Sequence, residues 1–572
     1  MKNILYLFLL MVAAAGITSC DELTFGNKFL GDAPEREGAT LDTMFSSQVR
    51  ADQVLTTAYA ALTYPLVSGT RMGGDVLESL TDLNYTFRTN QYYSGTMNAS
   101  ANGYSGGGNW KVIRYCWLYL ENVDRVPDMS DVQKKERKAE AKALMAIAYS
   151  EMLRNLGGVP WIDHAVKVTE TMKFPRETFS GTMDRIIRLL EEAIPDLNWK
   201  QSVAEEGRIT KAGAMGLKLR MLLFAASPTF NSDTKWHAQA DVYTCYGNYD
   251  KGRWEQAKKA GEEFMRELVA NGYYDLVQPE ENTHMARRLA FRKGYYERAT
   301  GETLISIQQG YSEDFHLGYM GGRYYLGPTL NYVDMFPWAD GSDFPSDFPW
   351  TNPSKQPFYE KDGTATRDPR LYETAAVPGE KYANGTYAPV YWGHDAYRKG
   401  VCTGFMMMKF ILTEDADRAS KPVQWPYLRL PEVLLSYAEA INEFDGTPNN
   451  TAYECVNRVR RRVGLSELTK GMGKEQFRAA VLKERALEFG QEEVRWYDLV
   501  RWGMTDVFKE KLYFLNSYIK EMNGSAPSAF KFEKAELTDR YWRTNWDTKW
   551  YMMPLPQSEI NKDYGWTQNP GW

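Results

Sequence analysis

Residues 482–503 combine ionisable and aromatic side chains at a spacing that could carry out acid–base chemistry. They read LKERALEFGQEEVRWYDLVRWG. Glu484 and Glu488 are four residues apart with Arg485 between them, so all three side chains would be neighbours on a helix. Two nearby carboxyl groups are what glycoside hydrolysis requires, one as the acid and one as the base or nucleophile.

The same stretch favours a second interpretation, an ion-pair network. Its acidic and basic residues alternate with Trp496, Tyr497 and Trp502 instead of forming a separate polar face. Charges mixed with large apolar groups are typical of a partly buried network that joins a helix to its neighbours. We therefore expect a structural role for Glu484 and Glu488, and a core position for Trp496.

The elements that must position this stretch are helices. Helical periodicity with Ala- and Leu-rich faces occurs in eight segments, which form four successive pairs. They are 49–66, 110–126, 138–156, 182–197, 209–227, 254–270, 431–444 and 451–463. Small residues stand where helices must approach closely. The pattern predicts a mainly α fold with about four tetratricopeptide-like helical pairs that form a scaffold.

The helical period largely disappears between residues 271 and 424, where Gly, Pro, Asp and aromatic residues dominate. This composition predicts an inserted loop-rich subdomain with short strands such as 303–307. The expected organisation has five parts, which are a signal peptide at 1–19, a tether at 20–48, a helical scaffold at 49–270 with a long loop at 67–109, the loop-rich subdomain at 271–424, and a C-terminal helical scaffold at 425–572.

The amino-acid composition argues against some classes of function and favours others. The chain has 572 residues, 43% of them hydrophobic, which is enough for a large core. A formal net charge of −6 and the lack of a basic stripe argue against nucleic acid as a partner. The 37 Tyr and 17 Trp are more than a core needs, and this excess suits a surface that stacks on flat ligand faces.

The residues that usually carry catalysis or metals are scattered. None of the five His residues belongs to an HExxH motif, and the sequence has no G-x-S-x-G and no phosphate-binding loop, so we expect neither an enzyme nor a cofactor. Asp340, Asp343 and Asp347 do not follow the spacing of a calcium-binding EF-hand. A structural calcium ion at these three residues and a solvated turn remain two alternatives.

The cysteines fit no zinc-binding pattern. Cys116 and Cys455 lie in helical patterns and are expected to be small core residues. Cys245 and Cys402 lie in loops, and the sequence leaves open whether they form a disulfide.

The N-terminus reads as an export signal. Lys2 precedes an apolar run at 4–17 that is too short for a comfortable transmembrane helix. The residues before Cys20 resemble a bacterial lipobox, in which the cysteine is lipidated and becomes the first mature residue. The alternative is an ordinary signal peptide with an incidental cysteine. Lipidation would attach the protein to a membrane through an N-terminal anchor.

Several separated segments, taken together, resemble the SusD/RagB family of glycan-binding outer-membrane lipoproteins. They are 141–160, 207–226, 302–307, 328–341, 368–370, 428–443, 482–503, 554–556 and 568–571. One departure is Gly490-Gln491, which stands where the family often has an aromatic and an acidic residue. We expect this change to alter local packing only.

This resemblance implies a lipid-anchored protein on the cell surface of a Gram-negative outer membrane. It also implies an oligosaccharide ligand and a SusC-like TonB-dependent transporter as the partner, with no reaction and no cofactor. Two alternatives stay open, a surface glycoside hydrolase or lyase and a tetratricopeptide-type scaffold that binds only proteins.

We expect the glycan on two segments, residues 82–93 (the first ligand segment) and 311–350 (the second ligand segment), with Trp392 as an outlier. Carbohydrate rings stack on exposed aromatic faces beside polar groups that satisfy the sugar hydroxyls. The residues with this chemistry are Asp82, Asn84, Tyr85, Arg88, Tyr92, Tyr93, Tyr311, His316, Tyr324, Tyr325, Trp350 and Trp392. For each aromatic residue the alternative is that it packs down onto the scaffold.

Overall fold

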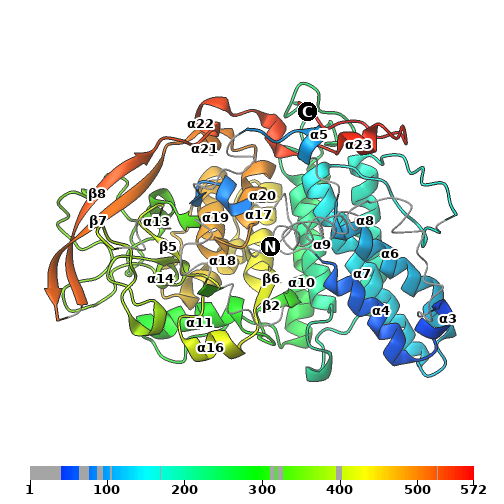
Figure 1. Ribbon diagram of the computed structural model, residues 1–572, viewed down its shortest axis with the longest axis horizontal. Coiled ribbons are helices and arrows are strands. Elements are labelled where there is room, and N and C mark those ends of the chain that lie inside the picture. Colours follow the sequence, from blue (N-terminus) through cyan, green and yellow to red (C-terminus); the bar gives the residue numbers. More distant parts are fainter. Residues whose placement is uncertain are drawn as a thin grey trace, which may run out of the picture.

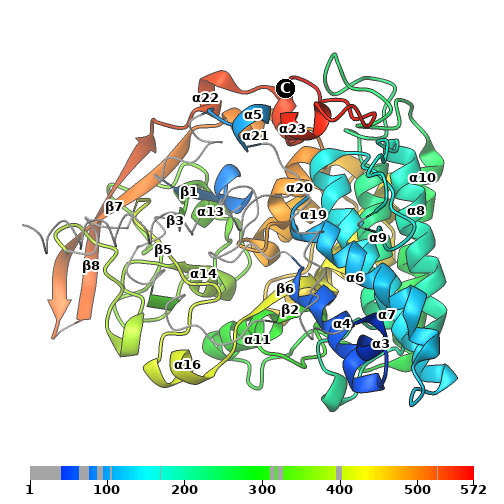
Figure 2. The same cartoon turned by 45° about the vertical axis from the view of Figure 1, so that its right-hand side comes forward.

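The computed structural model describes residues 40–62, 77–86, 95–102, 106–167, 169–308, 316–317, 326–394, 402–524 and 526–572. Helices packed side by side make up one half of the molecule, and a loop-rich half ends in a long hairpin (Figure 1). The helices α19 (Lys474–Phe489) and α20 (Val494–Arg501) lie between the two halves, and this arrangement stays visible when the molecule is turned (Figure 2). The mainly helical fold with small sheets confirms the predicted fold class.

The predicted helical pairs are present and stack in chain order. They are formed by α4 (Gln48–Ala60), α6 (Gly108–Asn122), α7 (Asp131–Leu156), α8 (Phe179–Ala193), α9 (Lys211–Ala226), α10 (Lys251–Asn271), α17 (Leu430–Asp445) and α18 (Asn450–Arg462). The two helices of each pair contact each other, and each pair contacts the next. Each helical hairpin therefore buries its apolar face on its neighbour.

Local sequence explains where these helices begin and end. A capping box formed by Ser130 and Gln133 starts α7, and Gly157, with φ of 78°, ends it. On α10, a Cβ added to Gly261 would lie 2.2 Å from the ring of Tyr437 on α17. Glycine is therefore required where these two pairs cross.

The strands in the described residues form four two-stranded antiparallel sheets. The pairs are β1 (Asn84–Thr86) with β3 (Leu326–Pro328), β2 (Thr303–Gln308) with β6 (Gln424–Arg429), β4 (Ala375–Ala376) with β5 (Met406–Met407), and β7 (Leu512–Asn523) with β8 (Ala526–Leu537). The strand predicted at 303–307 is confirmed as β2. Both β2 and β6 contact α9, so this sheet joins the loop-rich half to the helices.

The other α-helices in the described residues are mostly short, apart from α11 and α19. They are α3 (Leu41–Met44), α5 (Ala99–Asn102), α11 (His284–Tyr296), α13 (Leu330–Met335), α14 (Pro369–Thr374), α16 (Asp415–Ser420), α19 (Lys474–Phe489), α20 (Val494–Arg501), α21 (Thr505–Lys509), α22 (Trp542–Asn545) and α23 (Gln557–Ile560).

Two elements differ from the sequence-based expectation. The helix α11 lies in the predicted loop-rich region, and its period was hidden because Arg288 and Arg292 pair with buried Glu373 and break the apolar face. Residues 482–503 do not lie on one continuous helix but on α19 and α20. The chain breaks between α19 and α20, where Gln491 and Glu493 have φ of 73° and 59°.

The core has two main parts. The larger cluster joins the helical pairs to α20 and includes Trp496, which is 1% exposed, so its predicted core position is confirmed. A smaller, aromatic-rich cluster fills the loop-rich half and contains Trp338, Phe344, Phe348 and Trp350. No helix in the described part of the chain is both long and apolar enough to cross a membrane.

Candidate functional site

The charged residues of α19 and α20 form a buried ion-pair network. Glu488 is completely buried and lies 2.5 Å from Arg462, 3.0 Å from Arg429 and 3.2 Å from Arg370. Burial alone raises the pKa of the Glu488 carboxyl, but these three guanidinium groups outweigh it and hold the pKa well below its usual range. Glu484 lies 2.7 Å from Arg370. The predicted network is confirmed, and it is more deeply buried than we expected.

This network leaves no acid–base pair. A general acid needs a raised pKa and access to the substrate, whereas the Glu488 carboxylate is ionised and enclosed by arginines. The carboxylates of Glu484 and Glu488 therefore join α19 to α18, β6 and α14, and the structural interpretation holds for both.

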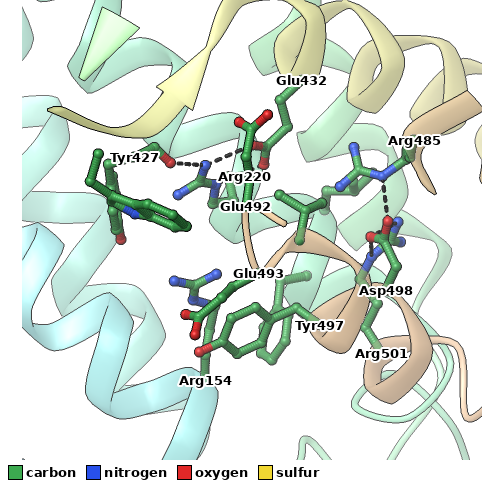
Figure 3. A pocket seen from close by; sticks show the side chains of 14 residues that line it. Arg154, Arg220, Tyr427, Glu432, Arg485, Glu492, Glu493, Tyr497, Asp498 and Arg501 are labelled. Atoms are coloured by element: carbon green, nitrogen blue, oxygen red, sulfur yellow. Dashed lines mark hydrogen bonds and ion pairs between the residues drawn. The ribbon is translucent and has the colours of Figure 1, made fainter. Parts of the chain in front are cut away.

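A small pocket lies beside the network (Figure 3). Its volume is about 40 Å³, and Arg154, Arg220, Tyr427, Tyr497 and Asp498 are among the side chains that line it. Two ion pairs close its walls: Arg220 Nε donates to Glu432 at 2.7 Å, and Arg485 Nε donates to Asp498 at 2.7 Å. The pocket has room for a few water molecules but not for a sugar ring.

The break between α19 and α20 is shaped by tertiary contacts. A Cβ added to Gly490 would lie 1.8 Å from the hydroxyl oxygen of Tyr332, which donates to Ala486 O. Lys409 Nζ donates to Gly490 O at 2.9 Å and to Glu492 Oε1 at 2.5 Å, so it satisfies a carbonyl that the broken helix leaves open. Glycine is therefore the residue that fits at position 490.

Residues 77–86 pack against the break between α19 and α20. They comprise the short helix η2 (Leu77–Leu80) and strand β1. Leu77 N donates to Glu493 Oε1 at 2.9 Å, and Gln491 N donates to Glu78 Oε1 at 3.0 Å. Burial raises the pKa of Glu78, the hydrogen bond from Gln491 N and the charge of Lys409 oppose this shift, and nearby Glu493 and Asp82 add to it. The net result is a pKa of about 8. The Glu78 carboxyl is therefore largely protonated at neutral pH.

Two further contacts are directional and buried. Arg495 donates to Asp82 twice, from Nε at 3.0 Å and from Nη2 at 2.9 Å. The side-chain amides of Asn84 and Gln491 donate to each other, at 3.0 Å and 2.8 Å. Both contacts fix residues of the first ligand segment onto the α19–α20 break.

The sheet of β1 and β3 joins the two ligand segments at their bases. Its register pairs Asn84 with Pro328 and Thr86 with Leu326. The chain leaves β1 after Thr86 and enters β3 at Leu326, so the part of the first segment that follows Thr86 and the part of the second that precedes Leu326 are joined to the same end of this ladder. The hydroxyl of Thr329 also donates to Asp82 O at 2.6 Å.

The predicted site residues in the described part of the chain are mostly buried. Asp82, Asn84 and Tyr85 are at most 3% exposed and contact the protein interior. His316 is completely buried, and burial followed by the charge of Arg418 lowers its pKa to about 4.

The two predicted tryptophans lie in opposite environments. Trp350 is 4% exposed and packs on Phe348, with ring centroids 4.9 Å apart. Trp392 is 57% exposed and lies near Tyr518 of β7, with ring centroids 6.2 Å apart. Of the predicted residues that the structure describes, Trp392 is the one with an exposed aromatic face. Cys20, Arg88, Tyr92, Tyr93, Tyr311, Tyr324 and Tyr325 lie outside the described residues.

Sequence reasoning missed the residues that hold the first ligand segment. Glu78 lies in the run LESLTDLNY at 77–85, where polar and apolar residues are interleaved, and this mixing resembles that of 482–503. In the sequence, Gln491 stands out only as a departure from the SusD/RagB family pattern. This interleaving indicates buried polar contacts, but no local pattern shows that the two runs contact each other.

Three of the four cysteines in the described residues are buried, and Cys402 is partly buried. Cys116 and Cys455 are buried core residues, as expected. Cys245 and Cys402 are not joined to each other, because the Cys245 thiol lies 3.6 Å from Asp241 O and the Cys402 thiol 3.6 Å from Tyr85 O.

The acidic turn at 340–347 makes contacts within the protein. Asp340 accepts hydrogen bonds from Ser342, and Asp343 pairs with Lys483 at 2.7 Å. The described residues contain no group of three or more His, Cys, Asp or Glu side chains that could hold a metal ion. Calcium at Asp340, Asp343 and Asp347 stays an untested alternative.

Comparison with known proteins gives consistent matches. The SusD family profile matches residues 289–572. A SusD-like protein of Bacteroides ovatus is 25% identical over 400 residues, which cover 68% of this chain and 63% of that protein, slightly under two thirds of its length. The starch-binding protein SusD of Bacteroides thetaiotaomicron is 23% identical over 464 residues, 79% of this chain and 75% of that protein.

Solved structures share the fold. The crystal structure of a SusD-like protein from Bacteroides fragilis superposes with a TM-score of 0.71 at 22% identity, covering 93% of this chain and 98% of that chain. A SusD-like carbohydrate binding protein from the same species gives a TM-score of 0.66 at 22% identity, covering 91% and 99%. The profile match, the relatives and the common fold agree with the motifs found in the sequence. The chain belongs to the SusD/RagB family.

Proposed function

We propose that this protein is a cell-surface lipoprotein that binds oligosaccharides and passes them to a SusC-like TonB-dependent transporter. The observation that carries the proposal is the β1–β3 ladder, which attaches both aromatic-rich ligand segments to one end of a buried support. Family membership supports the same function, because one relative is named as starch-binding and one structural neighbour as carbohydrate binding.

The proposed binding surface combines exposed aromatic faces with polar groups. We assign the glycan contacts to Arg88, Tyr92, Tyr93, Tyr311, Tyr324, Tyr325 and Trp392. Asp82, Asn84, Tyr85, His316 and Trp350 are assigned to the support beneath them, because their side chains are buried. A sugar ring would stack its C–H face on Trp392, beside the hydroxyl of Tyr518 and the carboxylate of Glu533, which lie 3.0 Å apart.

The proposed location is the outer face of a Gram-negative outer membrane, with lipidated Cys20 as the anchor. Such an anchor leaves the folded chain outside the bilayer and beside its transporter. Extraction in mild detergent followed by affinity purification should recover a β-barrel transporter together with this protein. Repeated recovery of this protein alone would contradict the proposed partnership.

Binding to a polysaccharide panel tests the ligand class. The chain beginning at Asp21 should be retarded in gels that contain one or more of amylopectin, laminarin, xylan, inulin, pectin and mucin. Incubation should release no new reducing ends and no unsaturated products. Release of either would favour a hydrolase or a lyase, and absence of retardation in every gel would favour a scaffold that binds only proteins.

The Trp392→Ala variant tests the assigned surface. It should lose most of the retardation that the unsubstituted chain shows. A matched control is Trp199→Ala, because Trp199 is also partly exposed but lies on the helical half, where its indole N–H donates to Gly272 O. Equal losses in the two variants would contradict a specific role for Trp392.

A further inference from the structure

We propose that Asn84, Gln491, Asp82 and Arg495 are positioning residues that fix the bases of the two ligand segments relative to each other. These four residues are called the clamp below. The inference rests on the proposed function, because it assigns the clamp a role in glycan binding. It adds that affinity depends on residues that do not contact the glycan.

The amide pair is the most directional part of the clamp. Each amide of Asn84 and Gln491 donates once and accepts once, and the two side chains are 0% and 3% exposed. Gln491 reaches Asn84 from a left-handed backbone conformation with φ of 73°, which is unfavourable for a residue with a Cβ. Glu493 repeats this conformation two residues later. Two strained residues in one buried segment indicate that the surrounding contacts enforce this backbone conformation.

The ion pair extends the clamp to the second ligand segment. Asp82 accepts two hydrogen bonds from Arg495 through its carboxylate, and its backbone oxygen accepts one from Thr329. Thr329 directly follows β3 and caps α13. A single residue therefore connects α20, the first ligand segment and the end of β3, so a shift at any one of them is passed to the others.

Residues 77–86 also make apolar contacts, which hold the segment in the core independently of the clamp. Leu77, Leu80 and Leu83 are at most 1% exposed and anchor residues 77–86 in the two core clusters. Loss of one polar contact would leave these three leucines in place. We therefore expect a clamp variant to fold, with the first ligand segment held less precisely at the ladder.

Hydrogen–deuterium exchange on the full protein, purified in mild detergent, tests the clamp without a ligand. Asn84→Ala and Gln491→Ala should each raise exchange in peptides covering 77–86 and 326–335 by roughly tenfold or more, because each substitution removes both hydrogen bonds of the buried amide pair. Peptides from α7 should not change. Unchanged exchange at 77–86, or an equal rise in α7, would overturn the inference.

Two further variants sharpen this test. The swap Asn84→Gln with Gln491→Asn keeps the summed side-chain length and the amide pair, and asparagine tolerates the left-handed conformation well. It should restore most of the protection. Asn231→Ala removes a buried amide between α9 and α10 that bonds to Ala226 O and Asp250 O. It should lower stability without loosening 77–86.

The binding readout uses whichever polysaccharide of the panel retards the unsubstituted protein. Well below the unfolding temperature, both alanine variants should bind it roughly tenfold more weakly, and the swap should recover the affinity. Raised exchange with unchanged affinity would show that the clamp serves stability alone and would overturn the inference. If no polysaccharide binds the unsubstituted protein, the proposed function fails, and the exchange data alone decide whether the clamp holds the two bases.

Discussion

The two tryptophans of the predicted site should respond to substitution in opposite ways. Trp350 is 4% exposed, and its ring lies 4.9 Å from that of Phe348 and 5.8 Å from that of Phe532. Trp392 is 57% exposed on the surface beside β7. Trp350→Ala should therefore cost folding stability, and Trp392→Ala should cost glycan affinity.

The magnitudes follow from burial. A buried aromatic side chain removes about 150–250 Å² from water, worth about 4–6 kcal/mol at roughly 25 cal/mol per Å². Alanine retains part of this area, so we expect Trp350→Ala to lower the free energy of unfolding by about 3–5 kcal/mol. Trp392→Ala should change it by less than about 0.5 kcal/mol while weakening binding by about 1–3 kcal/mol.

Urea unfolding followed by tryptophan fluorescence and circular dichroism measures the first effect, and gel retardation or calorimetry measures the second. The urea midpoints of the variants can be compared directly, because this comparison does not depend on a two-state transition. The reasoning is refuted if Trp350→Ala keeps the midpoint of the unsubstituted protein and loses glycan affinity. That result would mean that Trp350 contacts the ligand.

Three further predictions concern charge and anchoring. Glu488→Gln should lower the free energy of unfolding by about 3–5 kcal/mol, because it leaves three buried arginines without their shared carboxylate, whereas Glu521→Gln on the surface should not; equal urea midpoints would contradict this. Glu78 has a raised pKa of about 8, so its folded form keeps a proton that the unfolded chain releases near pH 4.5. Its contribution to the free energy of unfolding is therefore complete below pH 4.5 and is lost as the pH rises through 8. Glu78→Gln should remove this decline from the pH dependence of urea unfolding. An identical decline in the variant would refute the assignment of the decline to Glu78. Cys20→Ala should abolish lipidation and move the protein out of the outer-membrane fraction, and unchanged fractionation would contradict a lipid anchor at this residue.

The helical scaffold was predictable because its signals are local. Helix α10 was expected at 254–270 and spans Lys251–Asn271, and α17 was expected at 431–444 and spans Leu430–Asp445. Apolar periodicity, capping residues and small residues at close crossings all act within one or two turns. The ion-pair network was predictable for a similar reason, since charges and tryptophans share the same turns in one short stretch.

The hairpin of β7 and β8 was missed although the sequence carries a signal for it. Apolar and polar residues alternate over 530–533 of β8. Gly524-Ser525 lies in sequence between the paired residues Asn523 and Ala526, and this dipeptide favours two-residue hairpin loops. The break at 490–493 is different. Gln491 and Glu493 adopt left-handed conformations only because buried partners hold them, so no local pattern could have indicated it.

The predicted site shows the same limit. Asp82 and Asn84 have the side chains that a sugar site needs, and the sequence identified them for that chemistry. Their partners Arg495 and Gln491 lie 413 and 407 residues further along the chain. Contacts over such separations depend on the whole fold, so a polar residue beneath a site and a polar residue within it look alike in sequence.

A crystal structure with a bound oligosaccharide from the panel tests the central claim most directly. We predict that the sugar lies at the end of the β1–β3 ladder marked by Thr86 and Leu326, with at least one ring stacked on an aromatic side chain of the assigned surface. A sugar bound on the helical half, for example along α7 or α10, would contradict the account.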